Sequence, residues 1–355
     1  MSNSAKDWPG AFLTLAGTRF PIVQAPMVGA GGPDLCVAAI EGGALGSLPC
    51  GMLSPQDVAS QVAAVRARCG GPINLNFFCH TMPERVDDRA WRALLEPYRS
   101  EFNAAAPAAP AALRMPFDAA MCAAVEELRP RVVSFHFGLP AEPLLARVKA
   151  AGAAVIGNAT SVAEARWLAA RGADAIIAQG WEAGGHSGRF LESACDPMAL
   201  FALVPRIADS VDVPVIAAGG IGDGRGIAAA LLLGASAVQL GTAFLHCPEA
   251  AISAGHRARL AGEDTVVTNL LTGGLARGYA GRLVRELGPV RGEAPPYPLA
   301  AIALGPIRAA AEERGEYGFG PMWAGQGAAL GRAMPAATLV ESLAAEALAL
   351  LRGGA

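Results

Sequence analysis

The amino-acid sequence predicts an α/β protein, a (β/α)8 TIM barrel with a smaller accessory cap domain. Eight short runs, each apolar throughout, recur between residues 22 and 241. Ala- and Leu-rich segments of helical length separate these runs, and Gly or Pro often stands at the junction. Continuous apolar strands that alternate with helices are typical of a parallel sheet covered on its outside. The 355 residues exceed the roughly 250 of such a barrel and leave room for an accessory part.

The elements follow in order along the chain. The expected strands are residues 22–25, 44–47, 73–77, 132–135, 154–157, 175–178, 215–218 and 237–241. Ser54, followed by Pro55, marks the start of one helix. Thr160 or Ser161 starts another, which a cation and Gly172 end. The apolar pattern of 336–351 predicts a tail helix that closes the barrel.

Two segments break the alternation, and they define the predicted domains. We assign residues 1–78 and 117–263 to the barrel, on which the tail helix 336–351 packs. Residues 79–116 and 264–335 are too long and irregular for simple loops, so we assign them to the cap. We expect the cap beside the mouth of the barrel, where the catalytic loops of such folds collect.

The amino-acid composition limits the classes of binding partner and the cellular compartment that we expect for this protein. The formal net charge of −3 gives no basic patch for nucleic acid and no polybasic membrane signal. No run of about 18 uncharged apolar residues is present, and the first 20 residues lack a signal-peptide pattern. Seven scattered cysteines without a CxxC pair indicate free thiols. We therefore expect a cytoplasmic protein that acts on a small molecule; the sequence does not decide between a monomer and a homodimer.

Glycines after the last two expected strands predict a phosphate site. Gly219, Gly220 and Gly222 let backbone amides approach an anion, and a helix beginning near Asp223 would direct its positive end toward it. The pair Gly241-Thr242 offers further amides and a hydroxyl. Barrels commonly bind phosphate between these two strands. The alternative is that these glycines only make tight turns.

A second Gly-rich loop follows the sixth expected strand. Gln179 ends that strand with an amide that can donate or accept at the edge of a cofactor ring. Gly184 and Gly185 let the backbone approach a cofactor, and His186 comes next. Its ordinary pKa of about 6.5 suits a general base. The alternative is a histidine that only hydrogen-bonds within its loop.

Three further strand ends carry weaker signals. Pro26 and Met27 follow the first strand, where a polarizable thioether packs well on a flat ring. Asn76 projects toward the end of the third strand, but Asn74 has the same parity, so the pattern does not choose between them. His136 ends the fourth strand and either lines a pocket or packs.

The cap carries two aromatic residues of interest, Tyr297 and Trp323, which either wall a substrate pocket or pack in a core. Three other histidines, at positions 80, 246 and 256, have no metal-ligand spacing among them, so we expect no metal. Walker, GxSxG and paired CxxC motifs are absent from the sequence.

These segments together resemble the class I nitronate monooxygenases, formerly called 2-nitropropane dioxygenases. The matching motifs, which span nearly the whole chain, are QAPM (24–27), NFFCH (76–80), VSFHFG (133–138), QGWEAGGHSG (179–188), AAGGI (217–221), QLGTAF (239–244), GGLARGYAGRL (273–283), YPLA (297–300) and MWAGQ (322–326).

The resemblance implies an FMN enzyme without a metal, which oxidises alkyl nitronates with O2 to carbonyl compounds and nitrite. It implies that His186 is the base that deprotonates neutral nitroalkanes. The FMN contacts that it predicts, with their neighbours, are Ala25, Pro26, Met27, Asn76, Gln179, Gly184, Gly185, Gly219, Gly220, Gln239, Leu240, Gly241 and Thr242. His136, Tyr297 and Trp323 are the predicted substrate pocket.

Two positions depart from the family pattern. The residue after the loop histidine is Ser187 where the family has Arg, and GRPARG reads GGLARG (273–278) here. Both departures remove possible anion contacts near the substrate or in the cap. They therefore affect the prediction of the substrate and leave the prediction of a flavin unchanged. Two alternative functions stay open at this point: an FMN-dependent NAD(P)H:quinone or enoyl-thioester reductase, and a barrel that binds FMN or a metabolite without catalysis.

Overall fold

The computed structural model describes residues 8–84, 86–105, 113–192, 197–262 and 264–353. Eight parallel strands form one sheet in the order β1-β9-β8-β6-β5-β4-β3-β2. A bridge between Val23 and Leu45 joins the first and last of these strands, so the sheet closes on itself. The strands are β1 Ile22–Gln24, β2 Gly46–Pro49, β3 Ile73–Phe78, β4 Val132–His136, β5 Ala154–Ala159, β6 Ala175–Gln179, β8 Val215–Ala218 and β9 Ala237–Leu240.

This architecture confirms the predicted (β/α)8 barrel. Each expected apolar run coincides with one of the strands or overlaps it. The largest difference is at β2, which begins two residues later than predicted, at Gly46. Leu45 explains the difference, because its backbone pairs with β1 through Ile22 and Gln24 instead of continuing β2.

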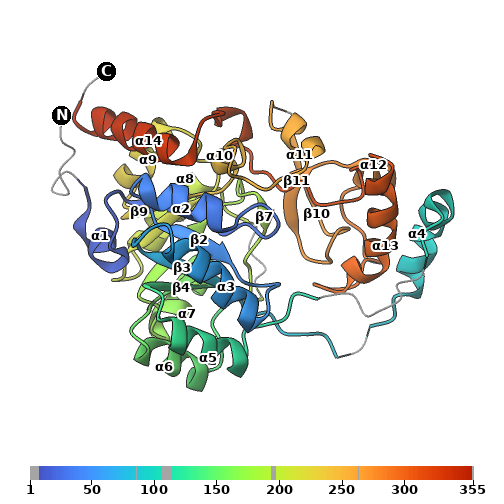
Figure 1. Cartoon of the computed structure of the whole chain (residues 1–355), viewed down its shortest axis with the longest axis horizontal. Helices are drawn as coiled ribbons and strands as arrows, with labels where there is room; N and C mark the ends of the chain where they lie inside the picture. The colour runs from blue at the N-terminus through green and yellow to red at the C-terminus, as the bar shows by residue number, and fades with distance from the viewer. Residues whose placement is uncertain (1–7, 85, 106–112, 193–196, 263, 354–355) are drawn as a thin grey trace.

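Helices cover the outside of the barrel (Figure 1). These helices are α1 Gly10–Ala16, α2 Pro33–Glu41, α3 Pro55–Arg66, α5 Ala119–Leu128, α6 Glu142–Ala150, α7 Val162–Ala170, α8 Leu200–Ala208, α9 Gly224–Leu232 and α14 Ala336–Leu351. Ser54 caps α3 in a reciprocal capping box with Asp57, and Ser161 rather than Thr160 caps α7. The tail helix has the predicted bounds and packs between α9 and α2.

A lobe beside the barrel mouth has its own hydrophobic cluster (Figure 1). The lobe contains α4 Arg89–Phe102, β10 Thr265–Thr268, β11 Ala276–Tyr279, α12 Arg282–Leu287 and α13 Ala300–Glu313. The short helix η2 Ala328–Leu330 packs instead on α10 Thr242–Leu245. Its two chain segments meet where α4 packs on α13, and Trp91 Nε1 donates to the carbonyl of Ala300 at 3.1 Å. The division of the chain into barrel and cap domains stays a prediction, and part of the predicted cap, residues 106–112, lies outside the described residues.

A small sheet that the sequence did not predict joins the lobe to the barrel. Gly185 and His186 form a two-residue strand, β7, in the order β10-β11-β7. His186 pairs with Ala276 and Gly185 pairs with Arg277, both antiparallel. The predicted catalytic loop is therefore fixed to the lobe through its backbone.

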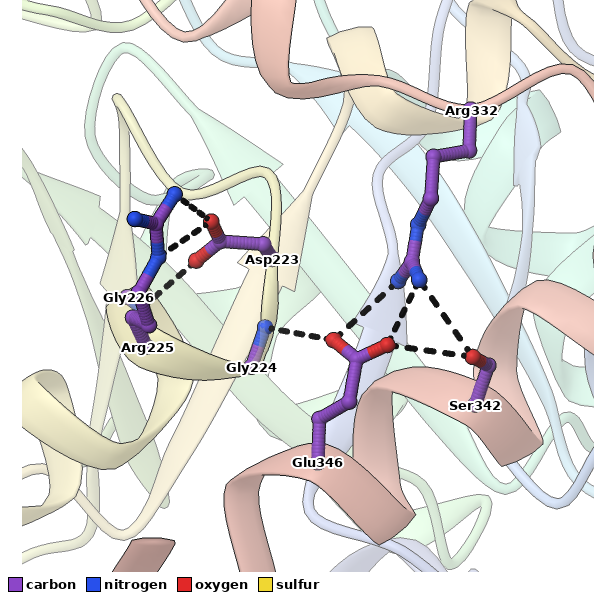
Figure 2. A network of polar contacts seen from close by, with 7 residues as sticks. All are labelled: Asp223, Gly224, Arg225, Gly226, Arg332, Ser342 and Glu346. Atoms are coloured by element: carbon purple, nitrogen blue, oxygen red, sulfur yellow. Dashed lines mark hydrogen bonds and ion pairs between the residues drawn. The ribbon is translucent and has the colours of Figure 1, made fainter. Parts of the chain in front are cut away.

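The tail helix is tied to α9 by a network of polar contacts (Figure 2). Glu346 accepts a hydrogen bond from the Gly224 amide at 3.2 Å and pairs with Arg332 at 2.5 Å. Asp223 accepts from the Gly226 amide at 3.1 Å. Two carboxylates therefore occupy the amides of Gly224 and Gly226 in the first turn of α9. That the positive end of this helix faces a phosphate stays a prediction.

Three further observations concern membranes, thiols and metals. Among the described residues, no helix is long and apolar enough to cross a bilayer. The six cysteines in the described part of the chain are free thiols, and Cys195 lies outside it. Within that same part, no group of three or more His, Cys, Asp or Glu side chains has an arrangement that could hold a metal ion.

Candidate active site

A cavity of about 660 Å³ opens at the carboxyl ends of the barrel strands, and we call it the main cavity. This volume lies in the range of roughly 300–1,000 Å³ usual for small-molecule and cofactor sites. The predicted site residues that line it are Ala25, Pro26, Met27, Asn76, His136, Gln179, Gly184, Gly185, His186, Gly219, Gly220, Gln239, Gly241, Thr242 and Trp323. Two predicted residues do not line it: Leu240, which is buried in the barrel, and Tyr297.

One end of the main cavity contains the glycines that the sequence predicts to bind a phosphate. Gly219 and Gly220 line it with φ of 120° and 68°, which residues with a side chain rarely adopt. Gly241 precedes the short helix α10, Thr242–Leu245. A short extra helix after the last strand is the usual partner of these loops in barrel phosphate sites. Thr242 Oγ1 accepts from the Gly325 amide at 2.9 Å and so fixes the lobe against this end.

Residues at the ends of the first and third strands line the main cavity. Met27 lies beside Gly241, where an added Cβ would stand at ordinary contact distance, 3.6 Å, from Met27 Sδ. Asn76 lines the cavity and donates to Ser134 Oγ at 3.0 Å. Asn74 instead donates to Ser47 Oγ inside the barrel. Of the two asparagines that the sequence left open, Asn76 is the one at the cavity.

The side chain of Gln179 forms several hydrogen bonds with the loop that carries His186. The sequence predicted only a contact with a cofactor ring for this side chain. Its Oε1 accepts from the Gly188 amide at 2.7 Å and from Asn158 Nδ2 at 3.0 Å. Its Nε2 donates to the His186 carbonyl at 2.9 Å. The amide thus spans the turn after His186, and one N–H is left for a cofactor.

His186 lies on the cavity wall with its ring held. Its Nε2 is 2.8 Å from Thr272 Oγ1. Burial, together with the nearby charge of Arg114 and two neighbouring histidines, holds the pKa of His186 well below its ordinary value. The ring is therefore neutral at pH 7, which is the state that a general base requires.

His136 contributes a second neutral ring to the same wall. Burial lowers its pKa to about 4, and a hydrogen bond with the His186 backbone opposes that shift. Its ring centroid is 6.0 Å from that of Phe78 and 4.5 Å from that of Phe137. His136 therefore both lines the cavity and packs, which were the two possibilities left open by the sequence.

Aromatic rings from the lobe enclose His186. The Tyr297 ring is 5.0 Å from the histidine ring and the Trp323 ring 5.4 Å, both edge-on. The Tyr297 hydroxyl is buried and has no hydrogen-bond partner among the described residues. Of these two aromatic residues, Trp323 lines the main cavity and Tyr297 packs on His186 from outside the cavity lining.

Sequence reasoning missed two arginines that face the main cavity. Arg114 lines it, and burial lowers the pKa of its guanidinium. Arg308 projects from α13 on the same face as Ala301 and Gly305, and pairs with Glu312 at 2.7 Å. Arg114 follows an Ala- and Pro-rich stretch without a motif, so no local signal marked it. Because Glu312 also lines the cavity and pairs with Arg308, the positive charge on this side comes mainly from Arg114.

Comparisons with known proteins identify the family. The nitronate monooxygenase family model matches residues 11–346. A nitronate monooxygenase of Paraburkholderia phytofirmans is 44% identical over 95% of this chain and 94% of its own, and one of Pseudomonas aeruginosa is 41% identical over 94% and 98%. Among solved structures, nitroalkane oxidase from Streptomyces ansochromogenes is similar with a TM-score of 0.87 and 37% identity, over 97% of this chain and 99% of that one.

Proposed function

This chain belongs to the nitronate monooxygenase family, and we propose that it oxidises alkyl nitronates with O2 at a bound FMN, giving a carbonyl compound and nitrite. It is an oxidoreductase, as its named relatives indicate. The observation that carries the proposal is the lining of the main cavity, which combines a neutral His186 and a cationic Arg114 with glycines suited to a phosphate.

The residues of the main cavity suit FMN. Backbone amides near Gly220 and Gly241, with the Thr242 hydroxyl, would hold its phosphate. Met27, Asn76 and the free N–H of Gln179 would contact its ring. When bound, the flavin supplies the redox chemistry, for which no amino-acid side chain substitutes.

The side chains of this protein bind and deprotonate. A nitronate is an anion, and a buried guanidinium such as that of Arg114 attracts it more strongly than an exposed cation would. A neutral nitroalkane carries no charge and must first lose the proton on the carbon beside its nitro group. His186 takes that proton because its ring is neutral, and the cationic Arg114 stabilises the nitronate that forms.

Reduction by substrate tests the proposal. The purified protein is mixed without air with propyl-2-nitronate and, separately, with NADH and NADPH, while the visible spectrum is recorded. We expect a yellow protein that the nitronate reduces and that both nicotinamides leave oxidised, with nitrite formed once air enters. Fast bleaching by a nicotinamide without a response to nitronate would indicate a reductase instead. A colourless protein that cannot be loaded with FMN would overturn the cofactor assignment.

A further inference from the structure

The ring of His186 is bonded to the hydroxyl of a threonine from the lobe. Thr272 Oγ1 lies 2.8 Å from His186 Nε2, and Thr272 is only 3% exposed. Thr272 precedes β11, whose Ala276 pairs with His186 in the small sheet. The backbone of His186 and its ring are thus both held by one segment, residues 272–277. Nothing in the pattern of the sequence had singled out this threonine.

We propose that Thr272 is a positioning residue for proton abstraction: its hydroxyl accepts the Nε2–H of His186, so that Nδ1 carries the lone pair that takes the substrate proton. The inference rests on the proposed function, in which His186 deprotonates a nitroalkane. It adds which ring nitrogen reacts and which residue of the lobe fixes the tautomer.

The proton transfer balances with this arrangement. The C–H bond beside the nitro group breaks, an N–H bond forms at Nδ1, and the C–H electron pair moves into the nitro group to give the nitronate. Both ring nitrogens then carry hydrogen, and Nε2–H still donates to Thr272 Oγ1. The hydroxyl therefore bonds the same hydrogen before and after the transfer, and no group has to reorient.

The surroundings of His186 make such an acceptor valuable. The titratable and charged groups that face the ring are Arg114, His136 and His80, with Tyr297 at its edge. Positive charge and burial both disfavour the imidazolium that forms on proton transfer. An oxygen that accepts from the charged ring acts in the opposite direction, and Thr272 places one at hydrogen-bond distance.

Replacement of the hydroxyl tests the proposal, and the lobe offers a matched control. Thr272→Val keeps the shape of the side chain and removes the acceptor, whereas Thr272→Ser keeps the hydroxyl. Thr268 is likewise 3% exposed and lies in the same small sheet, but its Oγ1 accepts from the Leu270 amide at 3.1 Å rather than bonding His186. Thr268→Val therefore removes a comparable buried hydroxyl bond. All variants are compared as FMN-loaded proteins, with nitroethane and ethylnitronate as the substrates.

We expect Thr272→Val to lower kcat/KM for nitroethane about 10- to 100-fold more than kcat/KM for ethylnitronate. The midpoint of the rise in nitroethane turnover with pH should also move to a lower pH, because the hydrogen bond that stabilises the charged ring is lost. Thr272→Ser should restore most of both effects, and Thr268→Val should leave the ratio as in the unmodified enzyme.

Two outcomes would overturn the inference. One is an unchanged nitroethane-to-nitronate ratio in Thr272→Val, and the other is an equal change of that ratio in Thr268→Val. Both leave the proposed function standing if the unmodified enzyme turns over the nitronate. Failure of the unmodified enzyme to oxidise any nitronate would instead overturn the proposed function.

Discussion

Gln179 Nε2 donates to the carbonyl oxygen of His186 at 2.9 Å, so the last residue of β6 holds the candidate base by its backbone. The same amide accepts from the Gly188 amide, and β11 pairs with the backbone of His186 from the other side. The position of the loop therefore depends little on the imidazole itself. The ring can be replaced to examine its chemistry without moving the loop that carries it.

His186→Asn is expected to separate two steps of the reaction. FMN content and nitronate oxidation should persist, because neither needs a proton acceptor at this position. Turnover of a neutral nitroalkane should fall by about 10²- to 10⁴-fold, the usual contribution of a general base. Steady-state kinetics with ethylnitronate and nitroethane measure both. Equal loss on the two substrates would mean that His186 is not the base.

Arg114→Met should weaken binding of the anionic substrate. Loss of a hydrogen bond to a charged group costs about 1.5–3 kcal/mol, which corresponds to a rise of roughly 10- to 150-fold in the KM for a nitronate. The KM for a neutral nitroalkane should change less. Arg308→Met should have a smaller effect, because Glu312 already compensates that charge.

The matched control for this charge is Arg89→Met. Arg89 is at the start of α4, its side chain is 88% exposed, and it is not among the residues that line the main cavity. It should leave both KM values unchanged. A nitronate KM that stays the same in Arg114→Met would remove Arg114 from the binding site.

Stability should fall on acidification, with His136 as one cause. Its pKa is about 4 in the folded protein and about 6.5 when unfolded, so between these values the unfolded chain binds a proton that the folded chain does not. The stabilisation is full above pH 6.5 and declines toward pH 4. Urea unfolding at pH 4.5, 5.5, 6.5 and 7.5 should show this slope, and His136→Gln should flatten it. An identical slope in the variant would argue against a buried neutral His136.

Gly224→Ala should loosen the tail helix. A Cβ at Gly224 would overlap the Cβ of Glu346 and approach the Ala347 amide to 2.8 Å, so α14 would have to shift away from α9. Such overpacking costs about 1–3 kcal/mol in the free energy of unfolding. Gly292→Ala is the control, since no atom lies within 4 Å of its added Cβ. Thermal unfolding of both variants measures the difference, and equal Tm values would show that α14 does not press on this position.

The barrel could be predicted from the sequence because its signals are local. The strand 215–218 is apolar throughout, and Pro214 precedes it; the structure has β8 at those residues. The tail helix has a continuous helical pattern, and its bounds are those predicted. Buried parallel strands and amphipathic helices depend on residues near one another in the chain, so composition and period suffice.

The parts that the sequence did not predict depend on distant residues. Strand β7 has only two residues, Gly185 and His186, and exists because β11 pairs with it some 90 positions later. The first amide of α9, that of Gly224, is bonded to Glu346, 122 positions away. Arg114 and Thr272 meet His186 only in the folded chain. Contacts between residues so far apart in the chain do not produce a periodic pattern of apolar residues in either segment, so the sequence does not predict them.

The lobe is made of two pieces of chain, and this has a consequence for biosynthesis. Trp91 bonds to a carbonyl 209 residues later, so the apolar face of α4 leaves the ribosome long before α13 exists to cover it. At a rate of synthesis of about 5–20 residues per second, this apolar face stays uncovered by α13 for roughly 10 to 40 seconds. In this interval Trp91, Leu95 and Phe102 form an exposed apolar stripe of the kind that nascent-chain chaperones bind. The surroundings of His186 are likewise complete only after the last part of the chain has been made, because Thr272 and Trp323 come from it.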